Sequence, residues 1–159
     1  MKKIFLLLSL FLLSSPTYSE INDPFEINLT CKDDKAGIPV SIVINSVKEE
    51  VSYQGSDPDS YFLKNNVFVF SMLGGEYTYT FQLNRNTGLL KIKAYNFSKE
   101  QERNINKEAV DIMIANKLIN TENGDYKKSD LVEVLHGIYE NKNTKEVFFM
   151  NCEKSKTKF

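Results

Sequence analysis

Hydrophobic and polar residues alternate most regularly between residues 77 and 95 of this 159-residue chain. The apolar positions before and after a short interruption are Tyr77, Tyr79, Phe81 and Leu83, then Leu90, Ile92 and Ala94. A period of two places successive side chains on opposite faces, so the pattern predicts two strands. The interruption consists of Asn84, Arg85, Asn86, Thr87 and Gly88. Because Asn and Gly accept a left-handed backbone, these five residues predict the turn of a β-hairpin.

Shorter segments with alternating or β-branched residues lie on both sides of this hairpin. They predict strands at residues 25–31, 38–45, 51–53, 67–70 and 146–152. Polar segments with Gly, Pro or Asn separate these strands, most clearly at 32–37 and 55–60. We therefore expect five or six antiparallel strands in sequence, then a helical segment and a closing strand.

Helical spacing replaces the alternation after residue 96. Ser98 is followed three residues later by Gln101, the arrangement of a capping box, which predicts a helix over about 99–119; a helix broken near 104–106 is the alternative. A second helix is predicted by apolar residues on one helical face: Leu131, Val134, Leu135 and Ile138. Gly137 disfavours a helix at that point, so a strand at 131–139 is the alternative.

Residues 1–19 have the pattern of a secretory signal. Lys2 and Lys3 precede an apolar run at 4–13, and the small residues that follow favour cleavage after Ser19. The run is shorter than the ~20 residues that span a bilayer, which disfavours a membrane anchor. We expect an exported bacterial protein of the periplasm or the secreted space, with no stable membrane anchor after cleavage.

Cys31 and Cys152 are the only cysteines. In an oxidising compartment such a pair predicts a disulfide, which would join the first strand to the last. A reactive or metal-binding pair is the alternative, but two cysteines and one distant histidine make a poor set of metal ligands. A closing strand bridged to the first one indicates a sheet that curls toward a barrel, which removes exposed strand edges.

These patterns together predict a single α+β domain over residues 20–159. Its main part is an antiparallel sheet curled toward a small barrel, and a helical segment at about 98–139 is inserted before the last strand.

The charge of the chain argues against two classes of partner. Its 20 basic and 21 acidic residues give a formal charge of −1, and removal of Lys2 and Lys3 with the signal makes it more acidic. Nucleic acid or an anionic membrane surface is therefore not expected as the main partner.

The sequence contains none of the common catalytic motifs that we sought: G-x-S-x-G, a phosphate-binding Gly loop or H-E-x-x-H. His136, the only histidine, would act as a base only beside a nucleophile and an orienting acid. Folding could still bring carboxylates together, as in glycosidases, and Glu76, Asp111 and Glu133 are candidates. We expect no catalytic residue, cofactor or metal site.

The polar segment 120–125 has a faint likeness to a calcium loop. With Gly124 as its sixth position, Ile119 would be the first ligand and Asp130 the last, where an oxygen ligand and a bidentate Glu are needed. An ordinary turn is the better interpretation.

The β-rich part is strongly aromatic, with Tyr53, Tyr61, Tyr77, Tyr79, Tyr95, Phe62, Phe68 and Phe70. Such residues build ordinary cores or line a concavity for a small ligand, and a core is the favoured interpretation.

The cysteine positions and the turn at 84–88 resemble small exported bacterial β-rich proteins of unknown function. The chain also has a distant likeness to the periplasmic lysozyme inhibitors of the membrane-bound/C-type family. That likeness implies a disulfide-clamped β-barrel with a Ser-Gly-x-x-Tyr-like loop that enters the lysozyme cleft. The nearest match here is Gly74-Gly75-Glu76-Tyr77, which lacks the Ser, and the helical segment is foreign to that family.

A non-catalytic exported protein that binds an unknown protein or small molecule is the function that these observations favour. An envelope hydrolase that uses carboxylates and a carrier of a small apolar ligand are the alternatives. A cavity of several hundred Å³ inside the barrel would favour the carrier.

Overall fold

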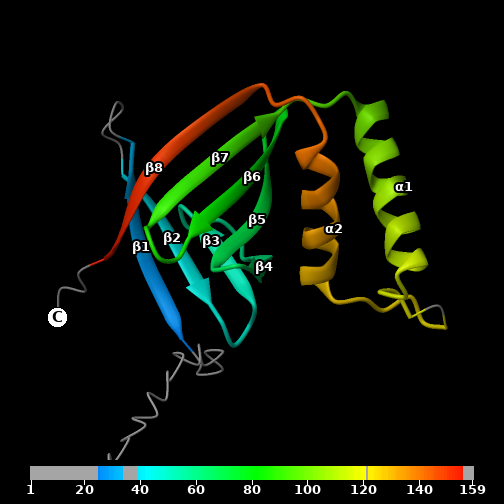
Figure 1. The fold of residues 1–159 in the computed structure, drawn as a ribbon, viewed down its shortest axis with the longest axis horizontal. Helices are drawn as coiled ribbons and strands as arrows, with labels where there is room; N and C mark the ends of the chain where they lie inside the picture. The colour runs from blue at the N-terminus through cyan, green and yellow to red at the C-terminus, as the bar shows by residue number, and fades with distance from the viewer. Residues whose placement is uncertain (1–24, 34–38, 121, 156–159) are drawn as a thin grey trace, which may run out of the picture.

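The computed structural model describes residues 25–33, 39–120 and 122–155, and over these residues the chain forms a closed antiparallel β-barrel with two helices beside it (Figure 1). Each strand pairs with the next one in the chain, and the last strand pairs with the first. The strands are β1 (Glu26–Lys32), β2 (Val40–Asn45), β3 (Glu50–Tyr53), β4 (Asp59–Lys64), β5 (Val67–Gly74), β6 (Tyr77–Asn84), β7 (Leu89–Tyr95) and β8 (Glu146–Lys154).

The predicted α+β class and the helical insertion before the last strand are confirmed. The alternating pattern at 77–95 forms β6 and β7, whose pairing runs from Thr78 opposite Tyr95 to Leu83 opposite Leu90. The predicted signal, residues 1–19, lies outside the described residues.

One strand, β4, was not predicted from the sequence, and residues 59–60 were wrongly included in a loop. Ser60, Tyr61 and Phe62 are all buried, so this strand has no alternation of apolar and polar positions. Tyr61 packs inside the barrel, whereas Phe62 packs on the outside against Val132 of the second helix. A strand covered on both faces reads as a continuous apolar run, which explains the error.

The helical segment consists of α1 (Lys99–Ala115) and α2 (Lys128–Glu140). Ser98 and Gln101 form the predicted capping box. Residues 131–139 are helical, so the alternative strand there is wrong. The helix that starts at Lys99 has no break at 104–106 and ends before 119, because Lys117 has a φ of +59°.

The second helix joins the helical pair to the barrel. Figure 1 shows α2 between the barrel and α1, and α2 contacts the outer faces of β4 and β5. Tyr95 at the end of β7 is fully buried in a second apolar cluster with Ile105 and Ala109 of α1 and Ile138 of α2. Among the described residues, no helix is long and apolar enough to cross a membrane.

The predicted disulfide between Cys31 and Cys152 is confirmed, and it lies where the barrel closes. The two residues are opposite each other in the pairing of β1 with β8, and their Cα atoms are 3.9 Å apart. Much of the barrel interior is packed, and the residues with at most 2% exposure include Ile42, Ile44, Phe68, Phe70, Leu83 and Leu90.

Candidate functional site

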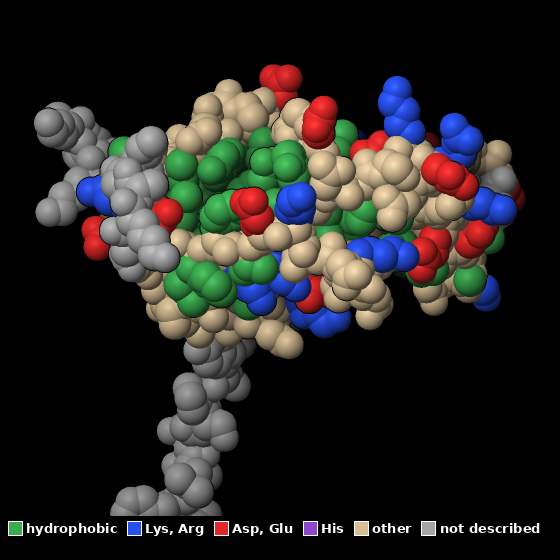
Figure 2. Space-filling view, turned by 90° about the horizontal axis from the view of Figure 1, so that it is seen from above, with side chains coloured by type: hydrophobic (Ala, Val, Ile, Leu, Met, Phe, Trp, Pro, Cys, Tyr) green, Lys and Arg blue, Asp and Glu red, His purple; other side chains and the backbone are tan. Residues whose placement is uncertain are grey.

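A cavity of about 650 Å³ lies at the end of the barrel where β3 meets β4 and where β5 meets β6. Its wall is formed by Met72, Tyr79, Phe81, Ile92, Phe148 and Met150, from four successive strands. The segment 53–56 also lines it, as do Leu73 and Gly74. Figure 2 views the molecule from this end and shows hydrophobic side chains gathered over the barrel.

The wall follows directly from the alternation along the strands. Phe148 and Met150 are two residues apart on β8, so both point to the barrel interior, while Phe149 between them points outward and is 53% exposed. Tyr79 and Phe81 have the same relation on β6. The inner face of the strands therefore supplies apolar groups at the cavity just as it does in the packed core.

Aromatic rings connect the cavity to the core beneath it. The ring centroid of Phe81 lies 5.0 Å from that of Tyr53 and 4.6 Å from that of Phe70, and the Phe81 and Phe70 rings are stacked. Gly74 allows the Tyr79 ring to approach the backbone, because a Cβ at Gly74 would lie 2.9 Å from that ring. This part of the wall is held by packed rings, which suits a preformed pocket.

Polar groups are confined to a few places around the cavity. The Ser56 hydroxyl accepts a hydrogen bond from the Tyr53 backbone N–H (3.2 Å) and donates one to the Asp57 carbonyl (3.3 Å). The Gln54 side-chain amide has no hydrogen bond to any other residue that the structure describes. Gln54 is exposed at the cavity mouth, and its amide, unlike the Ser56 hydroxyl, takes no part in the hydrogen bonds of the turn.

No Asp, Glu, Lys, Arg or His is among the described residues that line the cavity. Burial, and secondly the neighbouring Tyr79, raises the pKa of the Tyr53 hydroxyl, which therefore stays neutral at physiological pH. The cavity thus offers apolar surface and neutral hydrogen-bonding groups, and nothing in its described wall could neutralise a charged ligand.

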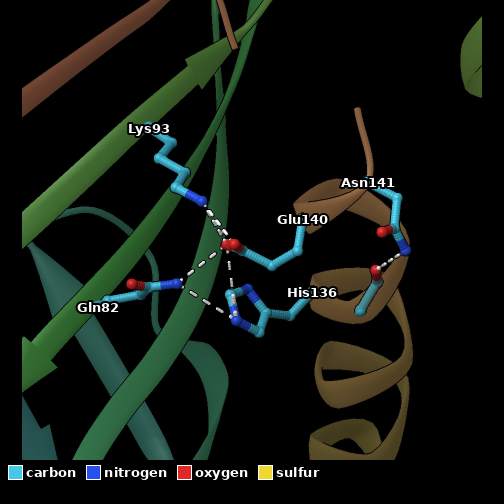
Figure 3. Close-up of polar contacts among 6 residues, drawn as sticks. Gln82, Lys93, His136, Glu140 and Asn141 are labelled. Carbon is cyan, nitrogen blue, oxygen red and sulfur yellow. Dashed lines mark hydrogen bonds and ion pairs between the residues drawn. The ribbon is translucent and has the colours of Figure 1, made fainter. Parts of the chain in front are cut away.

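A separate polar cluster ties α2 to the barrel (Figure 3). The Lys93 ammonium donates to both oxygens of Glu140, at 2.7 and 2.6 Å, and the Gln82 amide donates to Glu140 at 3.0 Å. His136 Nε2 lies 3.3 Å from the Gln82 amide nitrogen and 3.8 Å from Glu140 Oε1. Two strands and one helix are therefore joined through a single carboxylate.

The ionisable groups of this cluster suit an anchor better than a catalytic site. Burial raises the pKa of Glu140, but the hydrogen bond and the charge of Lys93 outweigh it, so the pKa lies below its usual value. Burial is also the largest effect on His136 and lowers its pKa. His136 is expected to be neutral and Glu140 ionised near pH 7, and neither residue lines the barrel cavity.

The other residues singled out in the sequence do not meet at one place. Glu76 lies between β5 and β6, Asp111 on α1 and Glu133 on α2, and all three are exposed. Glu133 forms an ion pair with Lys64 at 3.3 Å. These three carboxylates therefore do not form a hydrolytic pair.

Two other carboxylates, Asp59 and Glu102, line a crevice of about 270 Å³ between the barrel and the helices. Both residues are exposed, whereas a general acid needs desolvation to raise its pKa. Over the described residues, no three His, Cys, Asp or Glu side chains are grouped as a metal site.

The predicted hairpin turn lies at the other end of the barrel, between β6 and β7, and Gly88 has a φ of +70°. Gly74 and Tyr77, which carry the likeness to lysozyme inhibitors, end β5 and begin β6 beside the cavity. The sequence alone did not indicate a site at Gln54, Met72, Phe148 or Met150. Alternation within the predicted strand 146–152 was the available signal for the last two.

Comparisons with protein-family models, with curated proteins and with solved structures gave no significant match. The chemistry of the site is therefore taken from its own residues.

Proposed function

We propose that this protein is an exported, non-catalytic binding protein that takes a small, uncharged and largely apolar molecule into the open end of its barrel. The cavity of about 650 Å³ carries this proposal, because its size is that of typical small-ligand pockets and its wall is mainly aromatic and aliphatic.

The composition of the wall supports binding rather than catalysis. A general acid or base must reach the reacting atoms with a pKa near the working pH. The only ionisable side chains in the described wall are Tyr53 and Tyr79, and the pKa of Tyr53 is raised further from neutrality. The wall thus lacks the groups that the alternative hydrolase would need.

Two observations support export. The disulfide between Cys31 and Cys152 persists most readily in an oxidising compartment. Residues 1–19 have the charge and hydropathy pattern of a secretory signal.

Binding can be tested with N-phenylnaphthylamine, an uncharged aromatic dye whose emission rises in apolar surroundings. We expect a saturable increase in emission with the oxidised protein. In Met150→Trp the larger side chain should fill the cavity and weaken binding roughly tenfold or more, which corresponds to ~1.4 kcal/mol or above.

Phe149→Trp is the matched control, because it places the same side chain one residue away on the outer face of β8. Dye affinity should be unchanged in this variant. The proposal fails if the dye does not bind the native protein, or if Met150→Trp and Phe149→Trp bind it equally well.

A further inference from the structure

In the turn at the cavity mouth, one residue other than glycine has a backbone conformation that its side chain disfavours. Gln54 and Gly55 have φ values of +51° and +72°, and the Ser56 N–H donates to the Tyr53 carbonyl at 3.0 Å. This geometry is that of a type I′ turn, which favours Asn, Asp or Gly at its first central position. Gln54 occupies that position although its longer side chain gives it no advantage in the left-handed region.

We propose that Gln54 is a ligand-recognition residue, and that the natural ligand is an uncharged aromatic molecule with one hydrogen-bonding group that meets the Gln54 amide at the cavity mouth. This inference rests on the proposed function and adds the chemical class of the ligand.

Glu49 and Lys117 also have positive φ values, so the strain alone does not identify a function; of these residues, Gln54 is the one that lines the cavity. Asn would relieve the strain at Gln54 but would bring the amide nearer to the backbone by one methylene group. The longer side chain lines the cavity at its exposed mouth, and its amide has no hydrogen bond to another described residue, so solvent is its partner until a ligand enters. The amide can therefore both donate to a bound molecule and accept from it.

The rest of the wall supports an aromatic ligand. Tyr53, Tyr79, Phe81 and Phe148 provide ring faces and edges, and the sulfur atoms of Met72 and Met150 adapt to irregular aromatic shapes. A fatty acid or another anion would need a cationic partner, and the described lining residues include no Lys, Arg or His.

The test uses two probes of similar shape. N-phenylnaphthylamine carries one N–H group, and in benzylnaphthalene a CH₂ group takes the place of that N–H. We expect the native protein to prefer the amine by roughly three- to tenfold, as expected for one neutral hydrogen bond. In Gln54→Asn this preference should disappear, while the affinity for benzylnaphthalene stays unchanged.

The same substitution should stabilise the protein, because Asn-Gly is well suited to a type I′ turn. We expect the thermal midpoint to rise by roughly 2–4 °C. Lys117→Asn is the matched control, since Lys117 also has a positive φ (+59°) but follows α1 and does not line the cavity. It should raise the midpoint and leave both affinities unchanged.

The outcomes separate the two proposals. If neither probe binds the native protein, the proposed function fails and this inference fails with it. If both probes bind but the native protein does not distinguish them, or Gln54→Asn keeps the preference for the amine, only the inference about Gln54 is overturned. A preference that is lost equally in Lys117→Asn would also overturn it.

Discussion

Two features of the structure require a glycine at position 88, where the turn between β6 and β7 contacts β8 at Cys152. Gly88→Ala tests this requirement. Its φ of +70° disfavours any residue with a Cβ atom. A Cβ there would also lie 2.3 Å from the carbonyl oxygen of Cys152, so the backbone of β8 would have to move. The Cys152 N–H donates to the Gly88 carbonyl at 2.8 Å, and this hydrogen bond would be strained by the movement.

The magnitude follows from these two effects. Placing a residue with a Cβ in the left-handed region costs ~1–2 kcal/mol. Displacement of the neighbouring strand and loss of one hydrogen bond add ~1 kcal/mol or more. We therefore expect Gly88→Ala to lower the free energy of unfolding by about 2–4 kcal/mol.

Gly75→Ala separates the two effects. Gly75 has a φ of +63°, but among the described residues no atom beyond its chain neighbours lies within 4 Å of the position that its Cβ would take. Only the conformational effect of about 1–2 kcal/mol is expected there. Urea unfolding at equilibrium, followed by circular dichroism, measures both variants, and equal losses would refute the claim that β8 contacts Gly88 closely.

Three further outcomes are expected. Replacing Cys31 and Cys152 by Ala should lower the free energy of unfolding by about 5 kcal/mol, because the bridge closes a loop with a sequence separation of 121 residues; a thermal midpoint equal to that of the oxidised protein would contradict this. Burial holds the pKa of His136 below its ordinary 6.5, so stability should fall as the pH drops below about 6.5, since the unfolded chain takes up the proton more readily. Urea midpoints at several pH values check this, and the same slope in His136→Gln would exclude His136 as its source. Gly137 is exposed in α2 with open space around its Cβ position, so Gly137→Ala should stabilise the protein by ~0.5–1 kcal/mol, measured by urea unfolding; a lower midpoint would contradict it.

The sequence was most informative where one face of a strand is covered and the other is open. The alternation at 77–95 predicted the hairpin, and the two cysteines predicted the bridge between the first and last strands. Where helices cover the outer face of the sheet, the alternation is lost, as at Tyr61 and Phe62 in β4. Gly137 suggested a strand at 131–139 because its exposed position in the helix is not visible in the sequence.

The cavity could not be predicted, because it depends on closure of the barrel. Residues as distant in sequence as Gln54 and Met150 line the same space only after β8 pairs with β1. The left-handed backbone of Gln54 could not be predicted either, because Gln does not favour that conformation. An Asn-Gly pair at this place would have indicated it.

The central claim is that a small uncharged ligand enters the open end of the barrel, and methionine-methyl NMR tests it most directly. Apart from Met1, the chain has Met72 and Met150 in the cavity wall and Met113, which is 1% exposed, in α1. We predict that N-phenylnaphthylamine, added to ¹³C-methyl-labelled protein, shifts the Met72 and Met150 signals in a saturable manner and leaves Met113 unchanged. Unchanged Met72 and Met150 signals at a dye concentration that produces fluorescence would contradict the account, because the dye would then lie elsewhere.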